Sequence, residues 1–162
     1  MTATKPESGP KKSRRKTREF ALQALYQWKM AGDPAGVVMS QLAEEKEFAK
    51  IDEAHFAGLV TGAIDASADL DALIAPHIDR KVEELSPIEH AILLLGGYEL
   101  QKHPEIPYRV VINEAVELAK IYGGTDGHKF VNGVLDKLAG QLRAVEIAAK
   151  LEPKKKSPKS GA

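Results

Sequence analysis

The stretch LSPIEHAILLLGGYELQ, in the middle of the chain, constrains the fold more than any other. Ser86 is placed to be the N-cap of a helix, Pro87 its first residue, and Glu89 the residue that completes a capping box. The apolar residues that follow cover most of the helix circumference, whereas a surface helix carries a single apolar stripe. The sequence therefore predicts a central helix that other elements surround.

Helical periodicity recurs on both sides of this stretch, and no segment has the convincing alternation of a β-strand. Upstream, we expect helices near residues 14–30 and 37–48, a longer one capped by Asp52, and a further segment that Pro76 kinks or divides. Downstream, VINEAVELAKIY and HKFVNGVLDKLAGQLRAV each predict one helix. The predicted fold class is all-α, with about six or seven helices in two stacked helical-bundle subdomains.

Composition predicts how these helices are organised along the chain. Residues 1–12 are rich in Lys, Pro, Ser and Gly, and we expect them to form a disordered basic arm. We expect residues 150–162 to form a disordered Lys-rich tail for the same reason. The residues between them, 13–149, are predicted to form one helical domain, with subdomains at about 13–82 and 83–149.

The net charge of zero conceals a segregated pattern. Residues 1–18 carry seven Lys or Arg and one Glu, and residues 150–162 carry five Lys and one Glu. The remaining body therefore has 11 basic and 21 acidic residues. Basic arms favour binding to a polyanion, and an acidic body favours a basic protein partner. For the C-terminal tail, a role in solubility alone stays open as an alternative.

Several classes of function find no support in the sequence. The chain has no cysteine, which excludes disulfides and cysteine-bearing zinc sites. The N-terminus lacks the apolar stretch of a secretory signal, and the apolar runs are too short to span a bilayer, so we expect a cytoplasmic protein. The five histidines have no metal-ligand spacing, and no nucleophile–base pair can be assembled. We therefore expect no enzymatic activity, no metal and no cofactor.

A cluster of cations is fused directly to the first predicted helix, in RRKTREFALQALYQW. Arg14, Arg15, Lys16 and Arg18 stand at or near its start, where the helix dipole adds further positive potential. Such an array is suited to the phosphates of a single-stranded nucleic acid, and arginine can also stack on unpaired bases. Phosphate contacts supply affinity but carry no sequence information. Selectivity must therefore come from another part of the chain.

The turn GTDGHKF, before the last predicted helix, is the candidate for reading bases. Tyr122 and Phe130 flank the turn and could stack on splayed bases. Asp126 can accept hydrogen bonds from base amino groups, and Lys129 can contact phosphate. The alternative for Phe130 is a structural role in the core of the last helix.

Three stretches resemble the NusB family of bacterial transcription antitermination factors. They are RRKTREFALQALYQW, LSPIEHAILLLGGYEL and PYRVVINEAVELAKIYGGTDGHKFVNGVLDKL, in the family's order and spacing over residues 14–143. The resemblance implies an all-α fold of two helical subdomains. It also implies binding of the single-stranded boxA motif of rRNA leaders together with the ribosomal protein NusE. The pair would then join RNA polymerase and other Nus factors to suppress termination.

The same resemblance implies roles for individual residues. It supports RNA contact by Asp126, Lys129 and Phe130, and it places Tyr26, Glu83 and Glu89 at the surface that faces NusE. Two other functions stay open: a module associated with an rRNA methyltransferase, and a nonspecific RNA-binding adaptor. The chain ends before a catalytic domain could begin, which argues against the first of these. Whether the protein is a monomer or a homodimer is left open.

Overall fold

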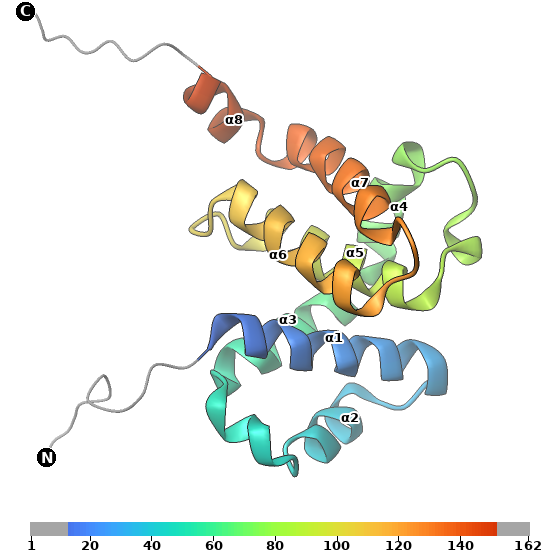
Figure 1. Cartoon of the computed structure of the whole chain (residues 1–162), viewed down its shortest axis with the longest axis vertical. Coiled ribbons are helices and arrows are strands. Elements are labelled where there is room, and N and C mark those ends of the chain that lie inside the picture. The colour runs from blue at the N-terminus through green and yellow to red at the C-terminus, as the bar shows by residue number, and fades with distance from the viewer. Residues whose placement is uncertain (1–12, 152–162) are drawn as a thin grey trace, which may run out of the picture.

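The computed structural model describes residues 13–151, and within that range every regular element is helical. Figure 1 shows the arrangement of these helices. The elements are α1 (Arg14–Ala31), α2 (Ala35–Leu42), the 3₁₀ helix η2 (Lys46–Lys50), α3 (Glu53–Asp65), α4 (Ser67–Ile74), η3 (Ala75–His77), η4 (Val82–Glu84), α5 (Pro87–Lys102), α6 (Tyr108–Tyr122), α7 (Gly127–Leu142) and α8 (Ala144–Leu151). The predicted all-α class is confirmed, but the predicted number of helices is wrong, because the described residues form eight α-helices.

The additional helix arises at Arg143, where the last predicted helix is interrupted. The buried guanidinium of Arg143 turns back to the C-terminal end of α5 and donates to the carbonyls of Leu100 (2.7 Å) and His103 (2.9 Å). Those carbonyls belong to the last turn of α5, where a helix has no internal donors for them. Beyond Arg143, α8 is fastened to the start of α6, because Glu146 accepts a hydrogen bond from the Tyr108 amide (3.0 Å).

The predicted second helix also ends earlier than the sequence pattern indicates. α2 stops at Leu42, and the chain continues as the short helix η2, which carries Phe48. Phe48 packs edge-on against Phe20 of α1 and Phe56 of α3, with ring centroids 5.4 and 5.2 Å away. Edge-to-face geometry is favourable for aromatic rings. The break at residues 43–45 therefore brings Phe48 into the core formed by α1 and α3.

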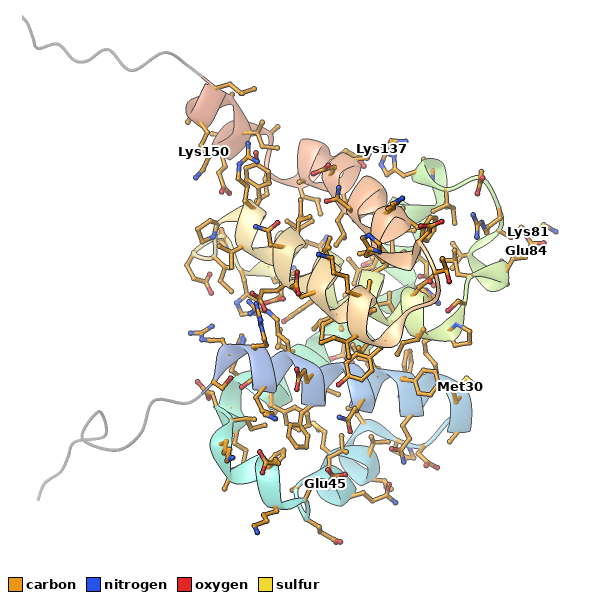
Figure 2. The ribbon with its side chains drawn as sticks, viewed as in Figure 1. Met30, Glu45, Lys81, Glu84, Lys137 and Lys150 are labelled. Atoms are coloured by element: carbon orange, nitrogen blue, oxygen red, sulfur yellow. The ribbon has the colours of Figure 1, made fainter. Side chains whose placement is uncertain are left out.

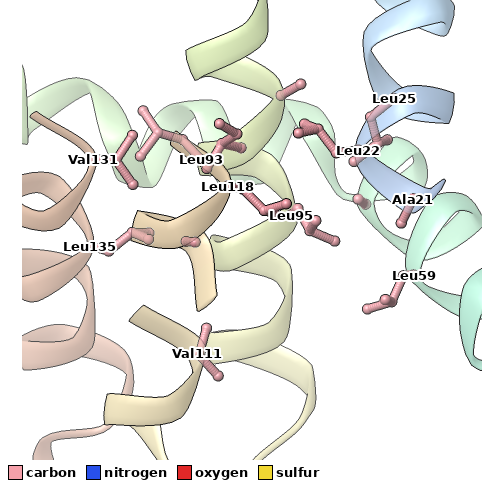
Figure 3. Packing of buried hydrophobic residues seen from close by; sticks show 14 of the residues in the cluster. Ala21, Leu22, Leu25, Leu59, Leu93, Leu95, Val111, Leu118, Val131 and Leu135 are labelled. Carbon is pink, nitrogen blue, oxygen red and sulfur yellow. The ribbon is translucent and has the colours of Figure 1, made fainter. Parts of the chain in front are cut away.

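α5 is the central helix, as the sequence predicts. It begins at Pro87, and Ser86 accepts a hydrogen bond from the amide of Glu89. It packs against α1 and α3 on one side and α6 and α7 on the other. Figure 3 shows Leu93 and Leu95 of this helix between residues of α1 and residues of α6 and α7. One continuous apolar cluster therefore holds the molecule together.

Two glycines let neighbouring helices approach α5 closely. A β-carbon at Gly96 would lie 2.9 Å from a methyl carbon of Leu135 in α7, and one at Gly97 would lie 3.3 Å from a methyl carbon of Leu70 in α4. The first distance is shorter than packed carbon atoms allow, so the Leu135 side chain or α7 itself would have to shift to admit a larger residue at position 96. The absence of side chains at these two positions therefore permits the close packing of α7 and α4 on α5.

The predicted organisation into arm, helical domain and tail stays a prediction. The predicted arm, residues 1–12, lies outside the described residues, as do residues 152–162 of the predicted tail. Lys150 and Leu151 were predicted to belong to the tail but form the end of α8. The division into subdomains near residue 83 stays a prediction. No helix within residues 13–151 is long and apolar enough to cross a membrane.

Candidate nucleic-acid interface

The basic cluster begins at a well-fixed helix terminus. Ser13 is the N-cap of α1, and its hydroxyl accepts a hydrogen bond from the amide of Lys16 (2.9 Å). The amide of Ser13 in turn donates to the carbonyl of Lys50 (3.1 Å), which ties the start of α1 to the end of η2. The cations that follow are therefore held in place by the fold, as their fusion to a helix predicts.

Arg18 is not part of the exposed cluster. Its side chain is 5% exposed, and its guanidinium makes a two-pronged ion pair with Glu99 of α5, with Nη2 to Oε2 at 2.9 Å. The prediction that Arg18 stands in a surface array is therefore wrong. The reason is helical spacing: Arg18 lies one turn before Leu22, on the stripe of α1 that faces α5. The sequence does not reveal that the Glu99 carboxylate of α5 lies next to this position and pairs with Arg18.

Arg14 and Arg15 are exposed and Lys16 is half-buried, and two of these three cations have carboxylate neighbours. Arg15 binds Glu114 of α6 with both prongs, Nε to Oε1 at 3.1 Å and Nη2 to Oε2 at 2.9 Å. Lys16 lies between Glu19 and Glu47, at 3.9 and 3.7 Å. Among residues 13–151, no carboxylate forms an ion pair with Arg14.

A shallow hollow of about 380 Å³ lies between the start of α1 and the start of α6. Arg14 and Arg15 line one side, and Ile106, Pro107 and Val110 supply an apolar wall on the other. Guanidinium groups beside an apolar wall can receive both a phosphate and the face of an unpaired base. The hollow therefore suits a single-stranded nucleic acid, but Arg15 must leave Glu114 before it can bind a phosphate.

The second predicted site, the turn before α7, contains a strained backbone. Asp126 has φ of 66°, the only positive φ at a non-glycine residue within the described part of the chain. It holds the N-cap position of α7, but its carboxylate makes no capping hydrogen bond and lies 3.4 Å from Nζ of Lys129. Such a conformation costs about 1–3 kcal/mol and persists only where surrounding contacts impose it. The exposed carboxylate of Asp126 remains accessible to a ligand.

The surroundings of Phe130 are compatible with both roles considered for it, which are stacking on a base and packing in the core. Its ring is half-buried against the core cluster, and the guanidinium of Arg80 stands over it, with Cζ 4.9 Å from the ring centroid. Together with His77, Lys129 and Lys137, these two residues line a hollow of about 300 Å³. Figure 2 shows Lys137 on the outer surface of α7. We call this stacked ring and guanidinium, with the lysines beside them, the platform; its chemistry is of the kind that suits a base and its phosphates.

Arg80 and Lys137 were missed by the sequence reasoning. Lys137 carries a usable signal, because it lies two helical turns after Phe130 on the same face of α7. Arg80 carries none, since it belongs to the irregular segment between η3 and η4, 50 positions before Phe130. Only the tertiary fold brings this arginine to the turn.

The two RNA-binding candidates stand at opposite ends of α6. The hollow beside Arg14 reaches the residues that start this helix, and Tyr122, which is 39% exposed, is its last residue. Fifteen residues at 1.5 Å each separate the two ends by about 20 Å. The surface between them is partly acidic, since Glu114 and Glu117 lie on α6. A bound strand would therefore make its strongest contacts at two separate places.

The residues predicted to face a protein partner have different environments. Tyr26 is 38% exposed on α1, and Met30, one turn later, is exposed at the end of that helix (Figure 2). Glu83 is exposed in η4. Glu89 is half-buried, and its carboxylate lies against Gly123 and Gly127 of the turn instead of completing a capping box around Ser86. The prediction of a complete capping box is therefore wrong, and Glu89 contacts the RNA candidate directly.

The histidines have structural surroundings. His90 bonds to Asp71 (2.6 Å), His77 to Gln141 (2.6 Å) and His103 to Glu105 (2.8 Å). Within residues 13–151, no group of three or more potential ligands is placed to hold a metal ion.

Comparison with known proteins agrees with this geometry. The NusB family model matches residues 15–140. The NusB transcription antitermination protein of Nitrosospira multiformis is 60% identical over 134 residues, which cover 83% of this chain and 85% of that protein. The protein of the same name from Ralstonia nicotianae is 56% identical over 146 residues, which cover 90% of this chain and 94% of that protein.

Solved structures give the same result. NusB of T. maritima superposes with a TM-score of 0.74 at 28% identity, covering 82% of this chain and 94% of that one. A complex of the antitermination factors NusB and NusE with dsRNA matches with a TM-score of 0.72 at 28% identity, covering 79% of this chain and 96% of the matched chain. On the strength of these matches, the chain belongs to the NusB family.

Proposed function

We propose that this chain is a non-catalytic transcription antitermination factor that binds boxA-type single-stranded RNA together with NusE. Two kinds of comparison support the proposal. The relatives that are more than half identical are named transcription antitermination proteins, and a structural neighbour is a NusB chain with NusE and RNA. As such a factor, the protein acts in the cytoplasm, in a complex with RNA polymerase and other Nus factors.

The observation that carries the proposal is the platform formed by Phe130 and Arg80 beside the strained Asp126. Asp126 presents an exposed carboxylate that can accept hydrogen bonds from base amino groups, while the ring and guanidinium offer a surface for stacking. Tyr122 and Lys129 extend the same site. This turn therefore selects the sequence.

The basic cluster supplies affinity at the other end of α6. Arg14, Arg15 and Lys16 contact phosphates there, and each such contact adds about 0.7 to the salt-dependence slope for a single strand. Arg18 contributes indirectly, because its buried pair with Glu99 fixes α1 on α5. Loss of Arg14 or Lys16 therefore weakens binding to every sequence alike.

The protein partner binds at the surface of Tyr26, Glu83 and Glu89. Tyr26 and Met30 provide exposed aromatic and apolar area on α1, and the carboxylates suit a basic ribosomal protein. Exposed charge pairs contribute only about 0–1 kcal/mol each, so Tyr26 is the expected hot spot. Joining partner and protein creates one composite surface, so RNA affinity rises when NusE is present.

Fluorescence anisotropy with a boxA strand and a scrambled strand tests the proposal. Binding is measured at two salt concentrations, with and without NusE. Preference for boxA that increases with NusE supports the antitermination role. Equal binding to both strands with a steep salt dependence would instead establish the nonspecific RNA-binding adaptor.

A further inference from the structure

We propose that Glu89 is a positioning residue for the RNA-selecting turn, in addition to being part of the partner surface. The inference rests on the proposed function, since it assumes that the turn from Gly123 to Gly127 selects RNA. It assigns to Glu89 a role that is present before any partner binds. Through this residue, the partner surface and the RNA turn become physically connected.

The first support is the position of the Glu89 carboxylate against both glycines of the turn. A β-carbon at Gly127 would overlap Oε2 of Glu89, and a β-carbon at Gly123 would lie 3.5 Å from the same oxygen. Gly127 is itself buried, at the first position of α7. The carboxylate therefore fills the space between the end of α6 and the beginning of α7, and the turn closes around it.

The second support is the strain at Asp126, which directly precedes Gly127. A left-handed aspartate carries a backbone cost that its surroundings must offset. Its own side chain does not cap α7, and the turn is closed by the hydrogen bond that the Gly127 amide donates to the Gly124 carbonyl (2.9 Å). The Glu89 carboxylate is in contact with the next residue and carries the charge that a helix N-terminus favours.

The third support is the rigidity of the element that carries Glu89. It lies in the first turn of the central helix, where its amide donates to Ser86 and Pro87 fixes the first helical residue. The next eight residues of α5, 90–97, are all buried in the core. Because Glu89 is fixed on this rigid helix, its carboxylate can hold the exposed turn in a defined position relative to the core.

As a consequence, partner binding and RNA selection both depend on the Glu89 carboxylate, so that each can strengthen or weaken the other. A cationic side chain of a basic partner that engages Glu89 alters its contact with Gly123 and Gly127. Any change at Gly127 reaches Asp126 and the start of α7, which carries Lys129 and Phe130. Coupling between two ligands requires such a shared element with differential contacts.

The test is performed on the full chain without NusE, so that a partner contact cannot contribute. The variants are Glu89→Ala, Glu89→Gln and Gly127→Ala, and the control is Glu44→Gln, which removes an exposed carboxylate just after α2, outside both proposed binding surfaces. We expect both Glu89 variants to lower the ratio of boxA to scrambled affinity by about fivefold, the low end of measured site couplings. For Glu44→Gln, neither the salt slope nor the ratio of boxA to scrambled affinity should change. Circular dichroism melting confirms that each variant is folded.

The double variant Glu89→Ala/Gly127→Ala makes the test specific to the contact. With Glu89 present, a methyl group at position 127 displaces the carboxylate and should reduce selectivity. With Glu89 already truncated, the same methyl group meets no side chain there, so it should have little further effect. Additive effects of the two substitutions would show that Glu89 and Gly127 act separately and would overturn the inference.

The two proposals fail in distinguishable ways. If the wild-type protein binds boxA and scrambled strands equally, the proposed function fails. If the wild-type protein prefers boxA and the Glu89 variants keep that preference without NusE, only the positioning role fails. Glu89 would then be a partner contact alone.

Discussion

Arg18 and Glu99, 81 positions apart in the sequence, form a buried ion pair between the first helix and the central one. The side chains are 5% and 1% exposed, and the guanidinium donates to both carboxylate oxygens. Removing one partner would leave the other as an uncompensated buried charge, which is far more costly than the pair itself. The cation that looked like part of an RNA-binding array is therefore a structural residue.

We accordingly expect Arg18→Met to lower the free energy of unfolding by about 3–5 kcal/mol, measured by urea denaturation. The double variant Arg18→Met/Glu99→Met should recover much of that loss, because it removes both buried charges. RNA affinity of the remaining folded protein should change little. Wild-type stability combined with a clear loss of RNA affinity would instead mean that Arg18 leaves Glu99 to reach the RNA.

The pair between Arg15 and Glu114 predicts a gain of function. Glu114→Gln should release Arg15 for a phosphate, so RNA affinity rises at low salt and the salt slope increases by about 0.7. The pair is exposed on the arginine side, so stability should change by no more than about 1 kcal/mol. The matched control is Glu117→Gln, which removes the same charge from α6 but disrupts an exposed pair with Lys120. If both variants gain the same RNA affinity, the gain comes from the change in net charge and not from the release of Arg15.

The platform of Phe130 and Arg80 predicts a loss of RNA selectivity. Stacking on an aromatic ring contributes about 1–3 kcal/mol per base, so Phe130→Leu should lower boxA affinity by at least about fivefold. Leucine keeps most of the apolar volume that Phe130 contributes to the core, which limits the effect on folding. Arg80→Ala should act in the same direction, and Lys137→Ala should weaken all sequences equally. Unchanged anisotropy titrations for Phe130→Leu would assign the ring to the core only.

Close packing at Gly96 predicts a loss of stability. Gly96→Ala should lower the free energy of unfolding by about 1–3 kcal/mol, because the new methyl group meets Leu135 at 2.9 Å. Gly140→Ala is the control, since a β-carbon at this helical position has no neighbour within 4 Å. That variant should gain about 0.5–1 kcal/mol from helix propensity. Chemical denaturation of both variants gives the comparison, and a stabilising Gly96→Ala would contradict the close approach of α7.

His55 predicts a pH dependence of stability. Burial, and then the nearby Arg14, lower the pKa of His55 below its ordinary value of 6.5. Its Nε2 atom has no hydrogen-bond partner within residues 13–151. Because the folded state favours the neutral ring, the unfolded chain binds a proton first as the pH falls. This contribution to stability is present above pH 6.5 and is lost as the pH falls through the lowered pKa.

The comparison of wild type with His55→Asn isolates this contribution. Melting temperatures measured between about pH 7 and pH 5 should fall less steeply for the variant, since it lacks the titrating ring. His90 and His103 remain in both proteins and provide the common background. Parallel curves for the two proteins would show that His55 does not contribute to acid sensitivity.

Local patterns in the sequence were sufficient for most of the helices. Asp52 and Ser86 cap α3 and α5 as expected, and the apolar circumference of α5 correctly identified the central helix. These features depend on residues within one or two turns of each other, which a single sequence displays directly. The division of the last predicted helix could not be foreseen, because Arg143 bends back to carbonyls 40 and 43 positions earlier.

By itself, the sequence determined the all-α class, the helix starts, the resemblance to the NusB family and the two regions where RNA contact is expected. Only the tertiary structure decided which charges in those regions are accessible. Glu99 withdraws Arg18 from the surface, Glu114 holds Arg15, and Glu89 lies under the RNA turn. Helix periodicity places a side chain on a face, but the charge it meets there comes from a distant segment. That pairing is therefore set by packing and not by any local pattern.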